Sequence, residues 1–171
     1  MNNTFLKLLL GGMLLILFQV LVFNNIPLTV GGRLNPYIYP YFLLILPLGI
    51  PRWMLLMVGF AYGLTIDIFS NTYGMHAATS VFIAWLRPTL LGWLTPRSGY
   101  EAEDEPRMGS LGFTWFFAYT ILVLAIHHFI YFFLEAFTLK FFGYTLVKTL
   151  VSLGFSTFIT ILLEYFFTNK K

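Results

Sequence analysis

Long apolar stretches, separated by short polar or Pro/Gly-rich breaks, dominate the chain. A bilayer core about 30 Å thick needs about 20 apolar residues of helix, and lipid leaves a non-helical backbone without hydrogen-bond partners. The pattern predicts six transmembrane helices, over residues 5–23, 37–50, 53–69, 75–94, 111–135 and 142–167. We therefore expect an all-α membrane protein: one six-helix bundle over residues 1–171, with one long polar loop at 95–110.

The second apolar segment is the least regular of the six. It is short and contains both Pro40 and Pro47, and proline interrupts a helix. A broken or re-entrant helix is tolerated in a membrane only inside protein or against a cavity. If residues 37–50 did not cross the membrane, the count would be five and the topology would reverse after this segment.

Basic residues set the expected orientation. With a cytoplasmic N-terminus, seven basic residues lie inside and two outside, with Lys148 left uncounted as part of the sixth helix. The outer residues are Arg33 and Lys140, and the inner ones are Lys7, Arg52, Arg87, Arg97, Arg107, Lys170 and Lys171. Because cytoplasmic loops carry the excess of Lys and Arg, both termini are predicted to be cytoplasmic.

Composition agrees with the hydropathy pattern and excludes several classes. The chain has 171 residues, of which 58% are hydrophobic and 10% charged, against about 25% charged in a typical soluble domain. There is no cysteine, which excludes disulfides, thiolate metal sites and cysteine nucleophiles. The net charge of +3 fits loops lying against anionic lipid better than a nucleic-acid partner.

The most distinctive polar pattern joins the third and fourth predicted helices. Residues four apart share a helix face, so Gly59, Gly63 and Asp67 form one line, and small-xxx-small spacing lets two helices approach closely. After a short turn, Gly74 and His76 open the next helix. A carboxylate in a membrane segment needs a partner, so we expect a helix hairpin closed by a polar clasp between Asp67 and His76. A ligand or proton site and a partner-binding site are the alternatives for this cluster.

The remaining charged residues give weaker signals. His127 and His128 are adjacent, so they point about 100° apart and do not form a chelating pair. Glu135 can pair with Lys148 across the outer turn, and Glu164 is expected to snorkel or to pair with a basic residue. The loop acids are either a solvated surface or a docking site for a basic partner; they are Glu101, Glu103, Asp104 and Glu105.

Motifs for catalysis are absent from the sequence. It has no GxSxG, HExxH or Walker pattern and no metal-ligand spacing. We therefore expect no catalytic residue, no cofactor and no metal: a protein that is not an enzyme.

The segment from Tyr62 to Ala78 resembles the signature region of the MreD family of bacterial rod-shape-determining proteins. The matching residues are Gly63, Asp67, Gly74 and His76, and residues 35–41 with Pro47 are similar to the second helix of that family. The resemblance implies a non-enzymatic scaffold of the rod complex in the bacterial inner membrane, maintaining cell shape through peptidoglycan synthesis. The partners it implies are an MreC-like periplasmic coiled-coil protein, MreB, RodA and a class B transpeptidase.

That family is also similar in fold to the substrate-binding subunits of energy-coupling-factor transporters. The alternative function is therefore a vitamin-like small-molecule binding subunit of a membrane transporter. A closed, polar-lined outer cavity would favour such a ligand, because small-molecule sites gather several polar groups around one cavity. A packed interior with a conspicuous apolar lateral groove would favour the scaffold.

Overall fold

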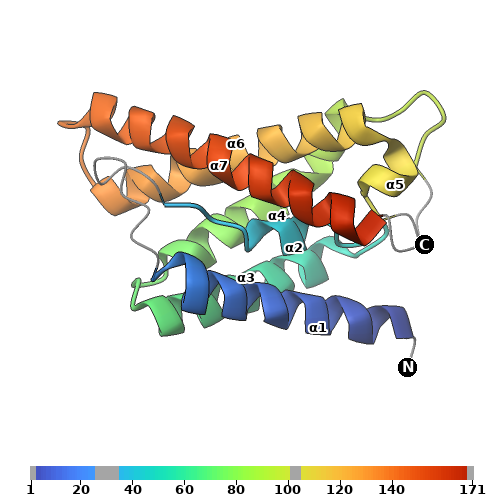
Figure 1. The fold of residues 1–171 in the computed structure, drawn as a ribbon, viewed down its shortest axis with the longest axis horizontal. Helices are drawn as coiled ribbons and strands as arrows, with labels where there is room; N and C mark the ends of the chain where they lie inside the picture. Colours follow the sequence, from blue (N-terminus) through green and yellow to red (C-terminus); the bar gives the residue numbers. More distant parts are fainter. Residues whose placement is uncertain (1–2, 26–34, 101–104, 169–171) are drawn as a thin grey trace.

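The computed structural model describes residues 3–25, 35–100 and 105–168. Within them the chain is helical, without strands. The long helices are α1 (Asn3–Phe18), extended by the π-helical turn η1 (Gln19–Phe23), α3 (Arg52–Ser70), α4 (Met75–Trp93), α6 (Phe113–Ala136) and α7 (Phe142–Thr168). Two short helices complete the fold, α2 (Pro40–Leu44) and α5 (Met108–Leu111) (Figure 1).

Four helical stretches are long and apolar enough to cross a membrane: Leu6–Phe23, Arg52–Ser70, Phe113–Ala136 and Phe142–Thr168. The protein is thus built as a multi-pass membrane protein. Helix α4 equals α3 in length at 19 residues but is not among the four. Its polar residues His76, Thr79, Ser80 and Arg87 are buried, because α4 packs against α3, α6 and α2 rather than facing lipid alone.

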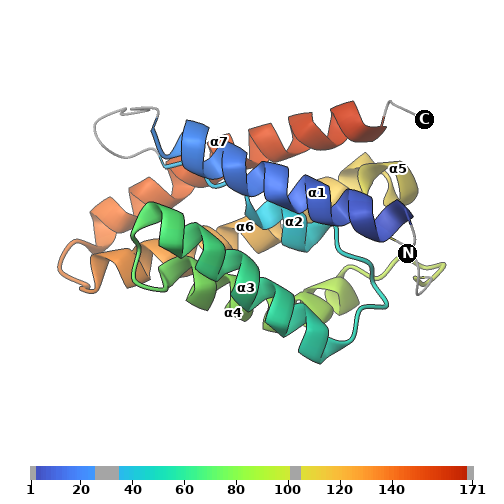
Figure 2. The same cartoon turned by 90° about the horizontal axis from the view of Figure 1, so that it is seen from below.

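Two helix hairpins make up most of the bundle. Helix α3 packs along α4, and α6 packs along α7. Helix α1 begins, and α7 ends, at the same end of the molecule, where α5 also lies (Figures 1 and 2). We call this the inner end, following the predicted orientation, and the opposite end, with the α3–α4 turn, the outer end.

The prediction of a helix over residues 37–50 is wrong for most of that range, because only Pro40–Leu44 is helical. Pro40 sits at the start of α2, where its missing N–H is not needed. Pro47 has no N–H to continue the helix, and α2 ends before it. Residues 36–46 are all buried, and the chain passes through the middle of the bundle (Figure 2). We call residues 35–47 the internal segment.

Side chains from two flanking helices satisfy the backbone at the start of the internal segment. This is the condition under which irregular backbone is stable at membrane depth. The bonds join Asn35 N to Ser152 Oγ (3.0 Å), Tyr37 N to Ser156 Oγ (2.9 Å), Ile38 N to Gln19 Oε1 (2.8 Å) and Gln19 Nε2 to Pro36 O (3.2 Å). The polar residues of η1 and α7 thus act as hydrogen-bond partners for a third part of the chain.

Arg87 plays the same part at the other end of the internal segment. Its guanidinium donates to the carbonyl oxygens of Leu44 (3.3 Å), Leu46 and Pro47 (3.5 Å), which follow or end α2. Its Nε also donates to the Tyr119 hydroxyl at 3.1 Å. A cation is favourable at a helix C-terminus, where carbonyls lack partners.

The burial of Arg87 corrects one step of the orientation argument. Arg87 is one of the seven basic residues assigned to the inner side, but it is 1% exposed and lies inside the bundle. Without it the basic residues divide six to two, so the predicted orientation is unchanged.

Candidate functional site

Helices α3 and α4 are in backbone contact at two glycines. A Cβ on Gly63 would lie 2.5 Å from the carbonyl oxygen of His76 and 2.6 Å from Cα of Ala77. A Cβ on Gly59 would lie 3.1 Å from Cβ of Ala84. Contacts under 3.0 Å with backbone atoms leave no room for a side chain, so Gly63 is required for this approach.

Asp67 lies one turn beyond Gly63 and is 5% exposed. Its Oδ1 accepts from the backbone N–H of His76 (3.0 Å), from His76 Nδ1 (3.0 Å) and from the Thr72 hydroxyl (2.6 Å). Its Oδ2 accepts from the backbone N–H of Ala77 at 2.8 Å. Asp67 therefore joins the His76 side chain and also caps the N-terminus of α4.

The capping role is a feature that sequence reasoning missed, although a signal for it exists. Helix α4 has Gly74 at its N-cap, with a φ of +86°, and no side-chain cap of its own. Its first N–H groups therefore need an acceptor from elsewhere, which a preceding helix ending in a carboxylate supplies. Ser70, in the last turn of α3, accepts a hydrogen bond from Asn24 at 2.8 Å.

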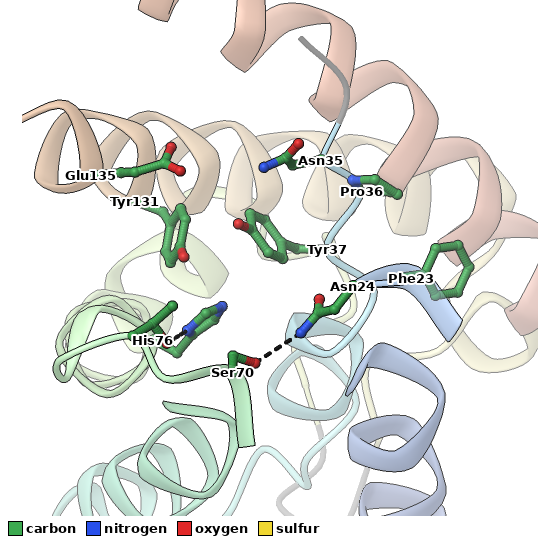
Figure 3. Close-up of a pocket in the computed structure, with 10 residues that line it drawn as sticks. Phe23, Asn24, Asn35, Pro36, Tyr37, Ser70, His76, Tyr131 and Glu135 are labelled. Atoms are coloured by element: carbon green, nitrogen blue, oxygen red, sulfur yellow. Dashed lines mark hydrogen bonds between the residues drawn. The ribbon is translucent and has the colours of Figure 1, made fainter. Parts of the chain in front are cut away.

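A cavity of about 270 Å³ opens at the outer end beside this clasp (Figure 3). Its walls come from η1, the internal segment, α3, α4 and α6 and are mostly polar. The residues that line it are Phe23, Asn24, Asn35, Pro36, Tyr37, Ser70, Thr72, His76, Tyr131 and Glu135. We call this space the outer cavity.

Three of the rings that line the outer cavity lie against one another. The Tyr37 and Tyr131 ring centroids are 4.6 Å apart, and that of His76 lies 4.6 Å from Tyr131 and 5.5 Å from Tyr37. At the rim, Glu135 Oε2 accepts from Lys148 Nζ at 2.6 Å, so the expected pair between these residues is confirmed.

The two adjacent histidines of α6 have separate partners behind this wall. His127 Nε2 bonds the Tyr39 hydroxyl, whereas His128 bonds Ser156 Oγ at 3.0 Å. In the described ranges, no group of three or more His, Cys, Asp or Glu side chains is placed to hold a metal ion.

A second buried carboxylate lies near the inner end. Glu164 is fully buried rather than snorkelling, and it accepts from Arg107 Nη1 (3.2 Å), the backbone N–H of Met108 (3.0 Å) and the Tyr41 hydroxyl. It thus ties the loop before α5 to the internal segment. Partial burial by itself lowers the pKa of Arg107, but Tyr41, Glu105 and Glu164 outweigh it and raise that pKa above its usual value.

The acidic loop is only partly covered by the structure. Glu101, Glu103 and Asp104 lie outside the described residues. Glu105 forms an ion pair with Arg107. One of the four acidic residues proposed for docking is therefore already paired with a basic residue of the same chain.

An apolar groove of about 400 Å³ lies on the side of the bundle between α6 and α7. Gly154 is exposed there, and a Cβ added to it would meet no atom within 4 Å. The groove residues are Phe117, Ile121, Leu150, Leu153, Gly154, Thr157, Phe158 and Ile161. We call this the lateral groove.

No known protein family, curated protein or solved structure matches this chain.

Proposed function

We propose that the protein is a non-enzymatic membrane scaffold that binds a partner's single transmembrane helix in the lateral groove. The groove itself is the observation that carries this proposal. Exposed apolar residues are ordinary on a membrane protein, but an apolar hollow between two long helices offers a shaped contact. Helices associate in lipid mainly through close packing, because lipid tails are as apolar as leucine.

The residues of the lateral groove fit a helix. Gly154 leaves the middle of the groove open, which permits close approach of a partner's backbone. Phe117 of α6 and Phe158 of α7 are exposed and flank it with large apolar surfaces. Leu150, Gly154 and Phe158 are spaced by four, so they share one face of α7.

The resemblance to the MreD family supplies the identity of the proposed partners. The scaffold would belong to the rod complex of a bacterial inner membrane and would bind an MreC-like protein, with MreB, RodA and a class B transpeptidase in the same assembly. The residues that carry the resemblance support it by their placement, because Gly63, Asp67 and His76 meet in one hairpin.

The six-pass topology and the likeness to energy-coupling-factor subunits belong to the same proposal. The start of α1 and the end of α7 lie at one end of the bundle, which supports an even number of passes. In this proposal the long helices and the internal segment are the six passes, with one of them mostly irregular.

Affinity capture from native membranes in a gentle detergent tests the scaffold. We expect the wild-type protein to recover a coiled-coil periplasmic protein and wall-synthesis enzymes, and Gly154→Leu to lose them by filling the groove. Gly143→Leu is the matched control, because Gly143 lies on the same helix and also has no atom within 4 Å of an added Cβ. Equal recovery by the two variants would refute docking in the lateral groove.

A second candidate function is a small-molecule binding subunit of a transporter. The outer cavity favours it, because its polar groups converge on one space. The same capture experiment distinguishes the two: an ATPase pair recovered with a bound small molecule supports the transporter subunit, and wall-synthesis proteins support the scaffold.

A further inference from the structure

The outer cavity contains a buried hydrogen-bonding atom without a partner. His76 is 1% exposed, and its Nε2 has no hydrogen-bond partner among the residues that the structure describes. Figure 3 shows the imidazole between Tyr131 and Asn24, with this nitrogen turned away from the marked hydrogen bond of the other ring nitrogen. An unpaired polar atom at this depth is costly, so it marks a place where a ligand gains a hydrogen bond.

The hydrogen-bond partners of Nδ1, the other ring nitrogen, determine whether His76 Nε2 is a donor or an acceptor. Nδ1 lies 2.8 Å from the Thr72 hydroxyl and 3.0 Å from Asp67 Oδ1. The one hydrogen of the Thr72 hydroxyl goes to Asp67 Oδ1, and a carboxylate only accepts hydrogen bonds, so Nδ1 carries the proton. In the neutral imidazole, Nε2 is then an acceptor. The ligand must therefore donate a hydrogen to the cavity.

The charge and the rings of the outer cavity narrow the ligand class further. Of the described residues that line it, Glu135 is the one with a formal charge; its Oε2 already accepts from Lys148 Nζ, so the carboxylate offers a ligand its other oxygen rather than a free negative charge. The Tyr37 and Tyr131 rings line the same cavity beside His76, and aromatic rings attract cations to their faces. An acceptor nitrogen, a carboxylate and aromatic rings together fit a protonated amine.

We propose that the outer cavity binds a primary ammonium group. The ammonium donates one hydrogen bond to His76 Nε2, lies against Tyr37 and Tyr131, and shares the Glu135 carboxylate with Lys148. The cavity of about 270 Å³ has room for roughly nine water volumes, enough for a small amine or for an ethanolamine headgroup. The inference names the ligand class of the outer cavity and does not depend on the lateral groove.

Free ethanolamine and choline are the paired probes, since choline keeps the hydroxyethyl chain and the positive charge but has three N-methyl groups in place of every N–H. We expect ethanolamine to raise the unfolding temperature of the detergent-solubilised protein and choline to bind about ten-fold more weakly, because it forms no charge-assisted hydrogen bond. Nitrogen NMR of histidine-labelled protein should show the Nε2 resonance of His76 moving on ethanolamine addition. Equal effects of the two probes would overturn the proposal.

The same pair of headgroups separates the two sources of the ammonium. In nanodiscs, stabilisation by phosphatidylethanolamine over phosphatidylcholine, without an effect of free ethanolamine, identifies a lipid. An effect of free ethanolamine identifies a soluble amine. No preference for the primary ammonium in either form refutes the site and leaves the capture test of the lateral groove unaffected.

Glu135→Gln removes the carboxylate charge beside the proposed ammonium and leaves the Asp67 clasp in place. The substitution keeps the side-chain shape, and we expect it to weaken ethanolamine binding. Glu105→Gln is the control, because Glu105 pairs with Arg107 near the other end of the bundle. Unchanged binding in Glu135→Gln, or equal loss in both variants, would count against the proposed geometry.

Discussion

Replacing Gly63 by alanine tests the closest contact in the bundle with one added methyl group. That methyl would lie 2.5 Å from the His76 carbonyl oxygen, 2.6 Å from Ala77 Cα and 2.7 Å from Ala77 N. All three atoms belong to the backbone of α4, so no side-chain rotation relieves the clash. Ordinary van der Waals contact begins at 3.4 Å, so α3 and α4 would have to move apart by about 1 Å to make room for the methyl group.

That separation also removes the Asp67 cap from α4. The bonds from Asp67 to the N–H groups of His76 (3.0 Å) and Ala77 (2.8 Å) would lengthen beyond hydrogen-bond range. Overpacking costs about 1–3 kcal/mol, and the loss of each membrane hydrogen bond costs about 0.6 kcal/mol. The higher helix propensity of Ala over Gly offsets up to about 1 kcal/mol of this loss. We expect the free energy of unfolding to fall by about 1–3 kcal/mol.

A glycine-to-alanine series in mixed micelles measures this effect against internal controls. Gly59→Ala should cost less than Gly63→Ala, because its Cβ would lie 3.1 Å from Ala84 Cβ and Ser80 O. Gly11→Ala should leave stability unchanged or slightly raised, because an added Cβ meets nothing within 4 Å. Hydrogen exchange at the His76 amide should accelerate in Gly63→Ala alone. If Gly63→Ala unfolded with the same free energy as Gly11→Ala, the close-packing argument would fail.

Three further substitutions test the buried polar groups. Asp67→Ala should lower the free energy of unfolding by about 1–2 kcal/mol, and unchanged detergent stability with unchanged partner capture would exclude the clasp. Arg87→Met should lower the free energy of unfolding by about 2–3 kcal/mol, because it leaves buried carbonyls unpaired. The exposed control Arg52→Met should change that free energy by less than about 0.5 kcal/mol. Equal unfolding curves for the two variants would contradict the role of Arg87. Glu164→Gln should speed hydrogen exchange at the Met108 amide, and an unaltered rate would show that Glu164 does not hold the loop.

Long apolar runs made most of the helices predictable from the sequence. The expected ranges 53–69, 111–135 and 142–167 agree with the observed α3, α6 and α7 to within two residues at each end. Such segments have one stable solution in lipid, because only a helix satisfies the backbone internally. The internal segment escaped prediction because its backbone is satisfied by residues distant in sequence, such as Ser156 and Arg87.

The candidate site was predictable where its residues are close in sequence. Spacing by four placed Gly59, Gly63 and Asp67 on one helix face, and the short turn brought His76 within reach. The outer cavity was not predictable as a shape, because its walls come from five separate parts of the chain.

One available signal was the polar stripe of α7, which runs at intervals of three or four along its buried face. Its members are Thr145, Thr149, Ser152, Ser156, Thr160 and Glu164. A stripe of this kind in an apolar helix indicates a polar neighbour inside the bundle.

The hydrogen bonding of the internal segment has a consequence for biosynthesis. Residues 35–47 precede α7 by about a hundred positions, yet Asn35 and Tyr37 bond to Ser152 and Ser156 of that last helix. While the chain emerges from the ribosome, the internal segment lacks these partners and cannot be stable in lipid as an independent span. Its final path is therefore adopted only after the C-terminal hairpin has been translated and inserted. A chain truncated before α7 would leave the internal segment exposed to membrane quality control.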